Sequence, residues 1–282
     1  MKNFKLAMPV LFALACGVAP VSAAPLLGAD LASFAVLAAS GVTNVATSTI
    51  GGNLGSAPNA SVGGGYVFSS GSIQANTAIA QNAQGQLDAA ILALDAFGVG
   101  TTLGTDLTGL SLFPGTYTVP AAATNLTGLL TLDGNGSNSA VWVFQFPGTL
   151  ITTGTAAAVQ VINTGNGANV GVYWNVHDAA TLDGPTFVGN VLASNLISSD
   201  GNLTIACGRL LSAETQVTLI QDSISITGCN NNSGGYDQGA AIGTGGTGGS
   251  NGQVVPEPDT VLLVGLGLVA LLASRKKSAA AT

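Results

Sequence analysis

Few side chains between the two ends of the chain could carry out covalent or metal chemistry. His177 is the only histidine, and Cys207 and Cys229 are the only cysteines downstream of residue 23. One imidazole cannot supply a zinc site by itself. A hydrolase triad would need the same imidazole, and no Gly-X-Ser-X-Gly turn precedes a helical pattern. We therefore expect no metal, no cofactor and no catalytic residue, and we place His177 at a solvated corner.

Carboxylates offer a second chemistry, the cleavage of polysaccharides, which needs clustered acids and commonly a basic residue. The only basic residue between Lys5 and Arg275 is Arg209, which lies in an apolar run and is expected to satisfy backbone carbonyls or a carboxylate. Asp178 and Asp183 are close in sequence, and Asp133, Asp200 and Asp222 could share a side. Because they are scattered singly, we predict that the protein is not an enzyme.

Hydroxyl side chains are abundant and recur in short runs closed by glycine, such as Leu150–Gly154, Thr181–Gly184 and Leu196–Gly201. Threonine carries a hydroxyl and a methyl on a stiff β-branched stem, so aligned threonines can present a regular surface to water. The residues predicted to share one such face are Thr127, Thr152, Thr181, Ser198 and Thr218. Since Asp183 and Ser199 interrupt the pattern, the alternative is a set of ordinary β-formers on a solvated face.

The elements that would position these hydroxyls are short apolar runs with β-favouring residues. They recur at Val141–Phe146, Val172–Val176, Phe187–Leu192 and Gly208–Leu211. Short strands separated by glycine at recurring intervals are typical of a β-solenoid. From Gly184 to Gly201 the step equals about one small three-sided coil, at roughly 3.3 Å per residue. The chain is therefore predicted to be mostly β, a stack of three-sided coils.

One segment has a different period. From Ile73 to Phe97, apolar residues recur at three- and four-residue steps, as in an amphipathic helix. Ser72 is a plausible N-cap and Gly98 a plausible C-terminal stop. The apolar positions of this stripe are Ile79, Ala83, Leu87, Ala90, Ile91 and Leu94. Such a helix must bury its stripe, and the side of a solenoid offers a surface for it.

The charge distribution excludes several classes of partner. The chain of 282 residues has a formal net charge of −7, and five of its six basic residues are terminal. A body with one basic residue cannot neutralise phosphates, which excludes nucleic acid. It also lacks a basic patch for an anionic lipid surface.

The N-terminal 23 residues have the three parts of a secretory signal. Lys2 and Lys5 precede an apolar run from Leu6 to Val18, and Val21-Ser22-Ala23 forms a small-residue cleavage site. An alternative is a lipoprotein box at Ala13-Leu14-Ala15-Cys16. Export is predicted in either case, with the folded domain spanning residues 24–233.

The C-terminal region has the composition of a linker followed by a targeting signal. Residues 234–254 are rich in Gly, Ser, Thr and Asn, which is typical of a flexible linker. Residues 255–282 contain Pro256, Glu257 and Pro258, an apolar run over 261–273 and a terminal basic cluster. The run is shorter than the roughly 20 residues of an ordinary transmembrane helix. Together these parts resemble the PEP-CTERM sorting tail of Gram-negative bacteria; a plain short anchor is the alternative.

The tail's resemblance implies cleavage near Pro256–Pro258 by an exosortase and delivery to the cell surface or an exopolysaccharide matrix. Only the transient apolar run would meet the membrane. In an exported protein Cys207 and Cys229 are expected to form a disulfide, which would contribute about 3 kcal/mol. Free thiols are the alternative.

Motifs spread over residues 27–227 resemble the microbial ice-binding protein family. In order they are Leu31–Ala38, Thr49–Gly55, Pro114–Tyr117, Val143–Phe146, Val172–Val176, Phe187–Ala193 and Gly208–Ser212. The resemblance implies a discontinuous right-handed β-solenoid with a long helix beside its axis. It also implies an ice-contacting surface on one flat face, for which the threonine runs are our candidate. The alternative function is adhesion to a polysaccharide or another surface, which exposed aromatic platforms would favour.

Overall fold

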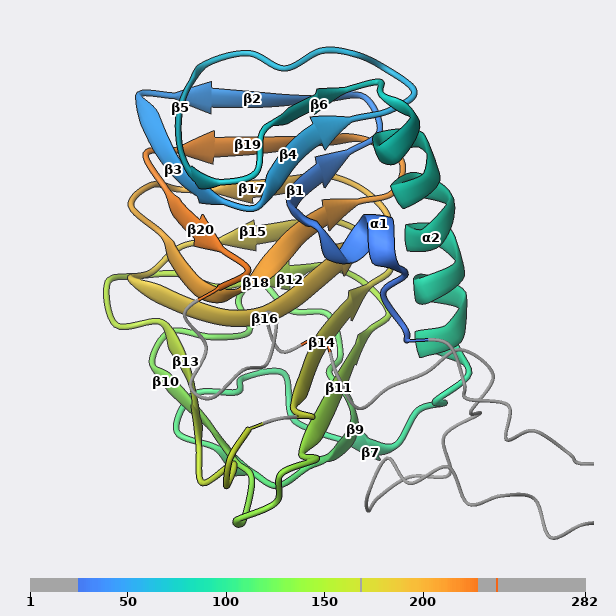
Figure 1. Ribbon diagram of the computed structural model, residues 1–282. Coiled ribbons are helices and arrows are strands. Elements are labelled where there is room, and N and C mark those ends of the chain that lie inside the picture. Colours follow the sequence, from blue (N-terminus) through green and yellow to red (C-terminus); the bar gives the residue numbers. More distant parts are fainter. Residues whose placement is uncertain (1–24, 168, 228–236, 238–282) are drawn as a thin grey trace, which may run out of the picture.

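The computed structural model describes residues 25–167, 169–227 and 237, and within them short strands stack into a three-sided solenoid (Figure 1). Every pairing between its named strands is parallel. The predicted signal peptide, Cys229, the Pro256–Pro258 motif and the apolar run over 261–273 lie outside the described residues. No helix among the described residues is both long and apolar enough to cross a membrane.

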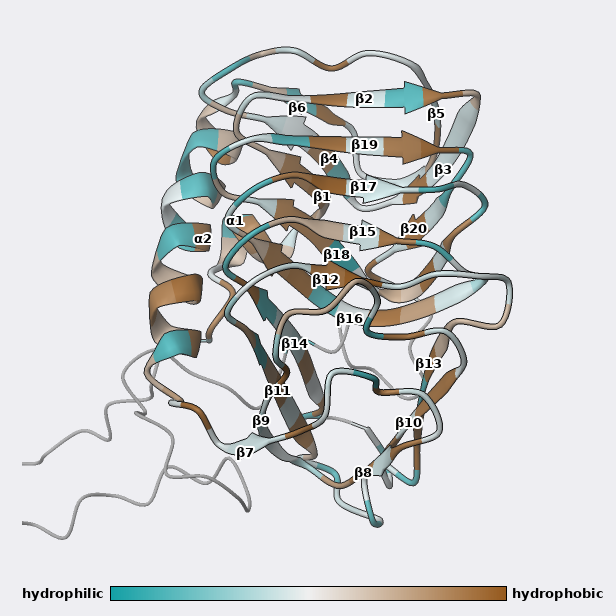
Figure 2. Cartoon of the chain, turned by 180° about the vertical axis from the view of Figure 1, so that it is seen from behind, coloured by the Kyte–Doolittle hydropathy of each residue, from teal (hydrophilic) through white to brown (hydrophobic). Residues whose placement is uncertain are grey.

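One face is a separate five-stranded sheet, seen on the near side of Figure 2. Its strands in spatial order are β12 (Leu150–Ile151), β15 (Ala180–Leu182), β17 (Ile197–Ser199), β19 (Gln216–Ile220) and β2 (Gly41–Val45). None of its pairings contains a register shift. The sheet is therefore a regular ladder from end to end.

The other two faces belong to one fifteen-stranded sheet that bends around the stack. The helix-side face contains β1 (Phe34–Ala38), β4 (Asn53–Ser56), β6 (Ile73–Ala75), β7 (Thr101–Thr102), β9 (Gly115–Thr118), β11 (Val141–Phe146) and β14 (Gly171–Val176). The third face contains β3 (Thr47–Gly51), β5 (Gly65–Ser70), β8 (Ser111–Leu112), β10 (Leu129–Asp133), β13 (Ala158–Ile162) and β20 (Ser223–Ser225). The long strands β16 (Thr186–Ala193) and β18 (Thr204–Ser212) run through both.

The order of coils in space differs from their order in the chain. The first strand, β1, pairs with β18, and β2 pairs with β19, so the N-terminal coil lies directly on the last one. After β6 the chain enters a helix, and it resumes coils with β7 at the far end of the stack (Figure 1). The predicted discontinuous solenoid with one long helix alongside is confirmed.

The long helix α2 (Ala78–Asp95) begins later than predicted, and a short helix α1 (Ala29–Ala32) lies beside it. The helix does not start at Ser72, because Ile73–Ala75 pairs with β4 as β6. Its N-cap is Thr77, whose hydroxyl accepts a bond of 3.3 Å from the Ala80 amide. The buried stripe consists of Ala80, Ala83, Leu87, Ala90 and Leu94. Ile79 is exposed, so the stripe is shifted by one residue at its start.

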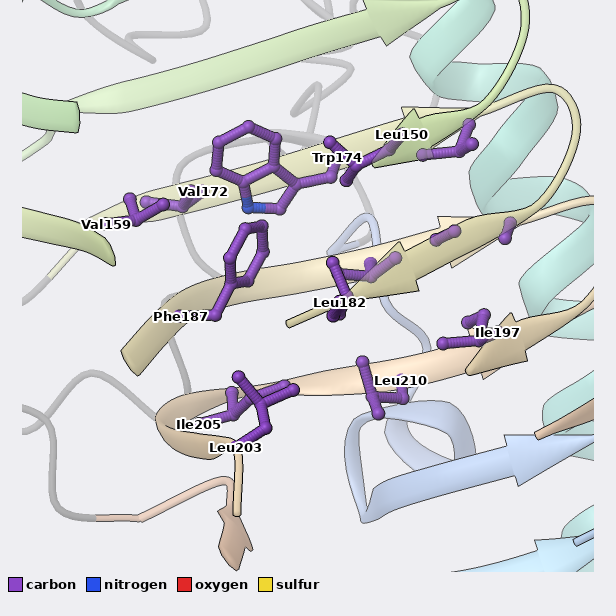
Figure 3. Packing of buried hydrophobic residues seen from close by; sticks show 14 of the residues in the cluster. Leu150, Val159, Val172, Trp174, Leu182, Phe187, Ile197, Leu203, Ile205 and Leu210 are labelled. Atoms are coloured by element: carbon purple, nitrogen blue, oxygen red, sulfur yellow. The ribbon is translucent and has the colours of Figure 1, made fainter. Parts of the chain in front are cut away.

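Apolar side chains fill both the inside of the solenoid and the space under the helix. Inside, Phe144 and Trp174 stack at 4.2 Å between ring centroids, and Phe187 follows Trp174 at 4.8 Å (Figure 3). Outside, Leu87 and Leu94 of α2 share a cluster with residues of the helix-side face, namely Val143, Tyr173, Leu192 and Leu211. Because side chains alternate along the strands of the helix-side face, these strands contribute to both cores.

Gly208 marks a shift of register between β16 and β18, and we expect its replacement by alanine to destabilise the fold. A Cβ there would lie 1.9 Å from the Gly189 carbonyl oxygen, so two backbones would have to separate. Such overpacking costs about 1–3 kcal/mol in the free energy of unfolding. Gly85→Ala is the control, because a Cβ on that helical glycine meets nothing within 4 Å.

We expect Gly85→Ala to stabilise the protein by up to about 1 kcal/mol, from helix propensity alone. Chemical denaturation of both variants measures the difference. Equal effects of the two substitutions would contradict the close approach of β16 and β18.

Candidate functional site

A column of small side chains runs down the outside of the five-stranded sheet. The register places Thr181 opposite Ser198, Ser198 opposite Thr218, and Thr218 opposite Thr43. Their neighbours in the chain, such as Leu182, point inward and are buried. The four hydroxyl residues are half-exposed or exposed, so they form one unbroken row on the surface.

The hydroxyls of this row lie close enough to interact along the stack. Thr43 Oγ1 donates to Thr218 Oγ1 at 3.2 Å, and Ser198 Oγ donates to Thr181 Oγ1 at 3.4 Å. Adjacent strands in a sheet lie about 4.8 Å apart, which sets the repeat of the row. The strands of this sheet contain no charged and no aromatic residue. The result is an uncharged row of hydroxyls and methyls, which we name the hydroxyl row (Thr43, Thr181, Ser198, Thr218).

The hydroxyl row contains three of the five residues predicted from the sequence, and the predicted exposure of Thr152 is wrong. Thr152 is 1 % exposed. Its Oγ1 donates to the Asp183 carbonyl at 2.6 Å and accepts from the Asp183 amide at 2.9 Å. Because side chains alternate along a strand, Ile151 takes the outward place opposite Thr181.

Thr127 is exposed but lies beyond the five strands. Its Oγ1 is 3.2 Å from Thr108 Oγ1, and its neighbour Leu126 bridges Thr152. Thr43 was missed because it lies far upstream of the other members. Nothing local in the sequence indicates that β2 pairs with β19, so the fourth hydroxyl comes from the discontinuity of the coils.

A second row of hydroxyls on the third face was also missed. Thr186 lies opposite Thr204, Thr204 opposite Ser223, and Ser223 opposite Thr49. The signal in the sequence is a hydroxyl residue directly before a core residue, as in Thr204-Ile205 and Thr49-Ile50. This face is less regular, because register shifts interrupt the pairings of β16 with β18 and of β3 with β5.

The carboxylates considered for catalysis are dispersed and serve turns. Asp183 accepts from the amides of Gly154 and Gly184, at 2.8 and 2.7 Å. Asp222 is buried, and it accepts from the amides of Leu203 and Ile220 and from the Ser199 hydroxyl. Burial raises the pKa of Asp222, and these hydrogen bonds oppose that shift. Among the described residues, no group of three or more His, Cys, Asp or Glu side chains could hold a metal ion.

His177 lies at an exposed corner after β14, as predicted, and beside the C-terminal end of α2. Its Nε2 is 3.0 Å from the Asp95 carboxylate, which also accepts from Asn175 Nδ2 at 2.7 Å. Asn175 Nδ2 is also 2.7 Å from Gln145 Oε1, and Gln145 Nε2 donates to the Leu94 carbonyl at 2.6 Å. These polar contacts fix the end of the helix to the helix-side face.

Arg209 satisfies a carbonyl and a carboxylate, as expected. It is 1 % exposed, and its Nη2 is 2.6 Å from the Ala32 carbonyl oxygen and 2.8 Å from Asp237 Oδ2. Burial lowers the pKa of Arg209, and the adjacent Asp237 carboxylate counteracts this. Cys207 is disulfide-bonded; its predicted partner Cys229 lies outside the described residues.

Known proteins share both the body and the tail of this chain. The Ice-binding-like family matches residues 36–225, and the PEP-CTERM protein-sorting motif matches residues 254–277. A protein of Nostoc sp. (strain HG1) called ice-binding protein is 34 % identical over 255 residues, covering 87 % of this chain and 84 % of the relative. An ice-binding protein of Colwellia sp. is 30 % identical over 217 residues, covering 70 % of this chain and 81 % of the relative.

Solved structures agree with these sequence relationships. The ice-binding protein of the Antarctic ascomycete Antarctomyces psychrotrophicus superposes with a TM-score of 0.64 at 30 % identity, covering 74 % of this chain and 100 % of that one. A domain of the Shewanella frigidimarina ice-binding protein gives 0.61 at 25 % identity, covering 72 % of this chain and 97 % of that one. The family match spans most of the solenoid, from β1 to β20. This chain therefore belongs to the Ice-binding-like family and ends in a PEP-CTERM protein-sorting motif.

Proposed function

We propose that this protein binds ice through the hydroxyl row and the side chains beside it on the five-stranded sheet. The observation that carries the proposal is the unbroken register of Thr43, Thr218, Ser198 and Thr181. Relatives that cover most of this chain are called ice-binding proteins, which supports the same function. Adsorption to ice would slow crystal growth and recrystallisation.

The physical basis is a match between two ordered surfaces. Each row member holds its hydroxyl at a fixed strand spacing, and buried residues behind it, such as Ile197 and Val217, keep the strand in place. A surface that is already rigid loses little conformational entropy when it orders water or meets a crystal. The absence of charge from the strands avoids strongly held water that does not fit an ice lattice.

We favour the five-stranded sheet over the third face because its ladder is regular. Bulges and register shifts bend a sheet and increase its twist. One shift lies between β3 and β5 of the third face, and another lies where β16 and β18 leave that face. The five-stranded sheet has none, and Figure 2 shows its strands stacked side by side. A flat crystal plane is best matched by the more regular of the two faces.

Adhesion to a polysaccharide is the second candidate, and the placement of the aromatics speaks against it. Trp142 and Trp174 are fully buried. Among the described residues, Phe113 is the one aromatic residue that is exposed, and it follows β8 on the third face. Sugar binding commonly uses exposed aromatic platforms, and the five-stranded sheet offers none among the described residues. Because the carboxylates are dispersed, we also propose a role without catalysis.

We further propose that the protein is exported and held at the cell surface, or in an exopolysaccharide matrix, of a Gram-negative bacterium. The match of residues 254–277 to the PEP-CTERM motif supports processing by an exosortase near Pro256–Pro258. A secreted protein kept near the cell would hold the cell close to ice, or slow the growth of ice around the cell.

The test is thermal hysteresis and ice-recrystallisation inhibition by the purified full chain, beside the same chain after heat denaturation. We expect activity that disappears with the fold, because the row exists only in the stacked coils. Binding of the chain to insoluble polysaccharides is measured in parallel. A folded chain that binds polysaccharide and leaves ice growth unchanged would replace the ice proposal with the adhesion proposal.

A further inference from the structure

The five-stranded sheet has a second outward column, two residues after the hydroxyl row. Val45 follows Thr43 on β2, and Ile220 follows Thr218 on β19. The register of the two strands places Thr218 opposite Thr43 and Ile220 opposite Val45. Because side chains alternate along a strand, all four point away from the core, whereas Leu219 is fully buried. Both strands end side by side at one edge of the sheet (Figure 2), so the surface there is two columns wide.

The side chains of the second column are accessible at β2 and β19. Val45 is 63 % exposed, and Ile220 is half-exposed. Valine has the shape of threonine with a methyl in place of the hydroxyl, and valine, isoleucine and threonine are all stiff because they branch at Cβ. The four side chains therefore form a stiff, uncharged patch of methyls and hydroxyls, which we name the wide end (Thr43, Val45, Thr218, Ile220).

The loop beside β2 leaves the wide end uncovered. Val62 bridges Val42 of β2, so the loop follows the outer edge of that strand. The next three residues, 63–65, are glycines. At Gly64 a Cβ would lie 2.6 Å from the Cβ of Asn44, and its φ of +109° is one that residues with a side chain rarely adopt. Glycines have no side chain that could rise above the neighbouring strand, so a crystal plane can reach the wide end from that side.

The second column changes in character at the next strand, β17. Ser198 pairs with Thr218, and continuing this register by two residues places Asp200 next to Ile220. The Asp200 amide donates to the Leu182 carbonyl at 3.1 Å, which extends the ladder beyond the end of β17. Asp200 is exposed, and a solvated carboxylate holds water that is costly to remove. The uncharged surface therefore narrows to one column at β17.

We propose that Val45 and Ile220 belong to the ice-binding surface and that Asp200 limits its width. The proposal rests on the proposed function and adds a second column to the hydroxyl row. Two columns can contact a crystal plane over an area, whereas a single row contacts it only along a line. Ice would therefore be held most firmly at β2 and β19, and the remaining members of the hydroxyl row would extend the contact.

The first test is Val45→Asp in the full chain, measured by thermal hysteresis and ice-recrystallisation inhibition at matched concentrations. We expect activity to fall at least about threefold, because contact with ice would have to remove water from a new carboxylate. Val45→Thr keeps the shape and adds no charge, so it should keep the activity. The matched control is Val67→Asp, because Val67 is 57 % exposed on β5 of the third face. It should leave the activity unchanged.

The second test is Asp200→Val, which should extend the second column to β17. We expect activity to rise at least about twofold, because the carboxylate and its bound water are removed. A gain of this kind does not follow from a merely structural role of Asp200. Asp88→Val is the control, since it removes a carboxylate from an exposed position on α2. It should bring no gain.

Circular dichroism checks that each variant is folded. Wild-type activity in a folded Val45→Asp would overturn the inference, and so would the lack of a gain in Asp200→Val, which decides the question if Val45→Asp does not fold. Either result with an active wild type leaves the proposed function standing. Loss of activity in Val67→Asp but not in Val45→Asp would move the surface to the third face. A wild type without activity on ice would overturn the proposed function and this inference with it.

Discussion

Thr181→Tyr is expected to abolish most of the activity on ice while leaving the fold intact. Thr181 is the end member of the hydroxyl row, and it lies between Ser198 of the row and Ile151 of the next strand. A tyrosine ring projecting from this place would hold a flat crystal plane away from the neighbouring side chains on both sides. A loss of about 1.4 kcal/mol in the free energy of binding lowers the affinity tenfold. We expect the lost contacts to cost at least this much. Thermal hysteresis at matched concentrations measures the loss.

Thr204→Tyr is the control for this substitution. Thr204 occupies the corresponding place in the row on the third face, between Thr186 and Ser223, and it is half-exposed like Thr181. It should keep wild-type activity. Loss of activity in Thr204→Tyr with retention in Thr181→Tyr would move the ice-binding surface to the third face. Retention in both would remove both rows from consideration.

Trp174→Ala is expected to have the largest effect on stability, about 3–5 kcal/mol in the free energy of unfolding. Trp174 is fully buried and stacks on Phe144 with 8° between the ring planes. Its indole N–H donates to the Val188 carbonyl at 2.9 Å, so truncation also leaves a carbonyl without that donor. Figure 3 shows the ring inside the solenoid, next to the ring of Phe187. Chemical denaturation with tryptophan-independent detection measures the change.

Leu92→Ala serves as the comparison, because Leu92 lies on α2 and is 71 % exposed. Its expected effect is within about 0.5 kcal/mol, as for most surface substitutions. If Trp174→Ala cost no more than Leu92→Ala, the aromatic stack would not be the packed centre of the solenoid.

Much of the fold followed from local patterns. Strands such as Val172–Val176 combine β-favouring residues with a glycine-bounded length, and the apolar period of residues 79–94 indicates a helix in any context. The resemblance of motifs such as Pro114–Tyr117 then supplied the long-range arrangement. The helix start was misplaced because Ile73–Ala75 pairs with β4, and a tertiary contact of this kind leaves no periodic signal in three residues.

The hydroxyl face was harder to predict because alternation makes a one-residue error decisive. Thr152 and Ile151 are neighbours, and only the pairing of Leu150 with Ala180 decides which of them points outward. Thr43 could not be assigned to the row, since it pairs with a strand 175 residues away. The ion pair between Asp237 and Arg209 could not be predicted for a similar reason, because it depends on the position of a distant strand.

The stacking of the first coil on the last one also sets the order of events during synthesis. Thr43 leaves the ribosome early, yet its partner Thr218 is made 175 residues later. In a nascent chain β2 therefore lacks its partner strand until β19 has been made, and contacts of such high sequence separation form slowly. Any chain that stops before β19 lacks the strand that joins β2 to β17. The proposed ice-binding surface is thus complete only in a finished molecule, and a truncated chain cannot carry it.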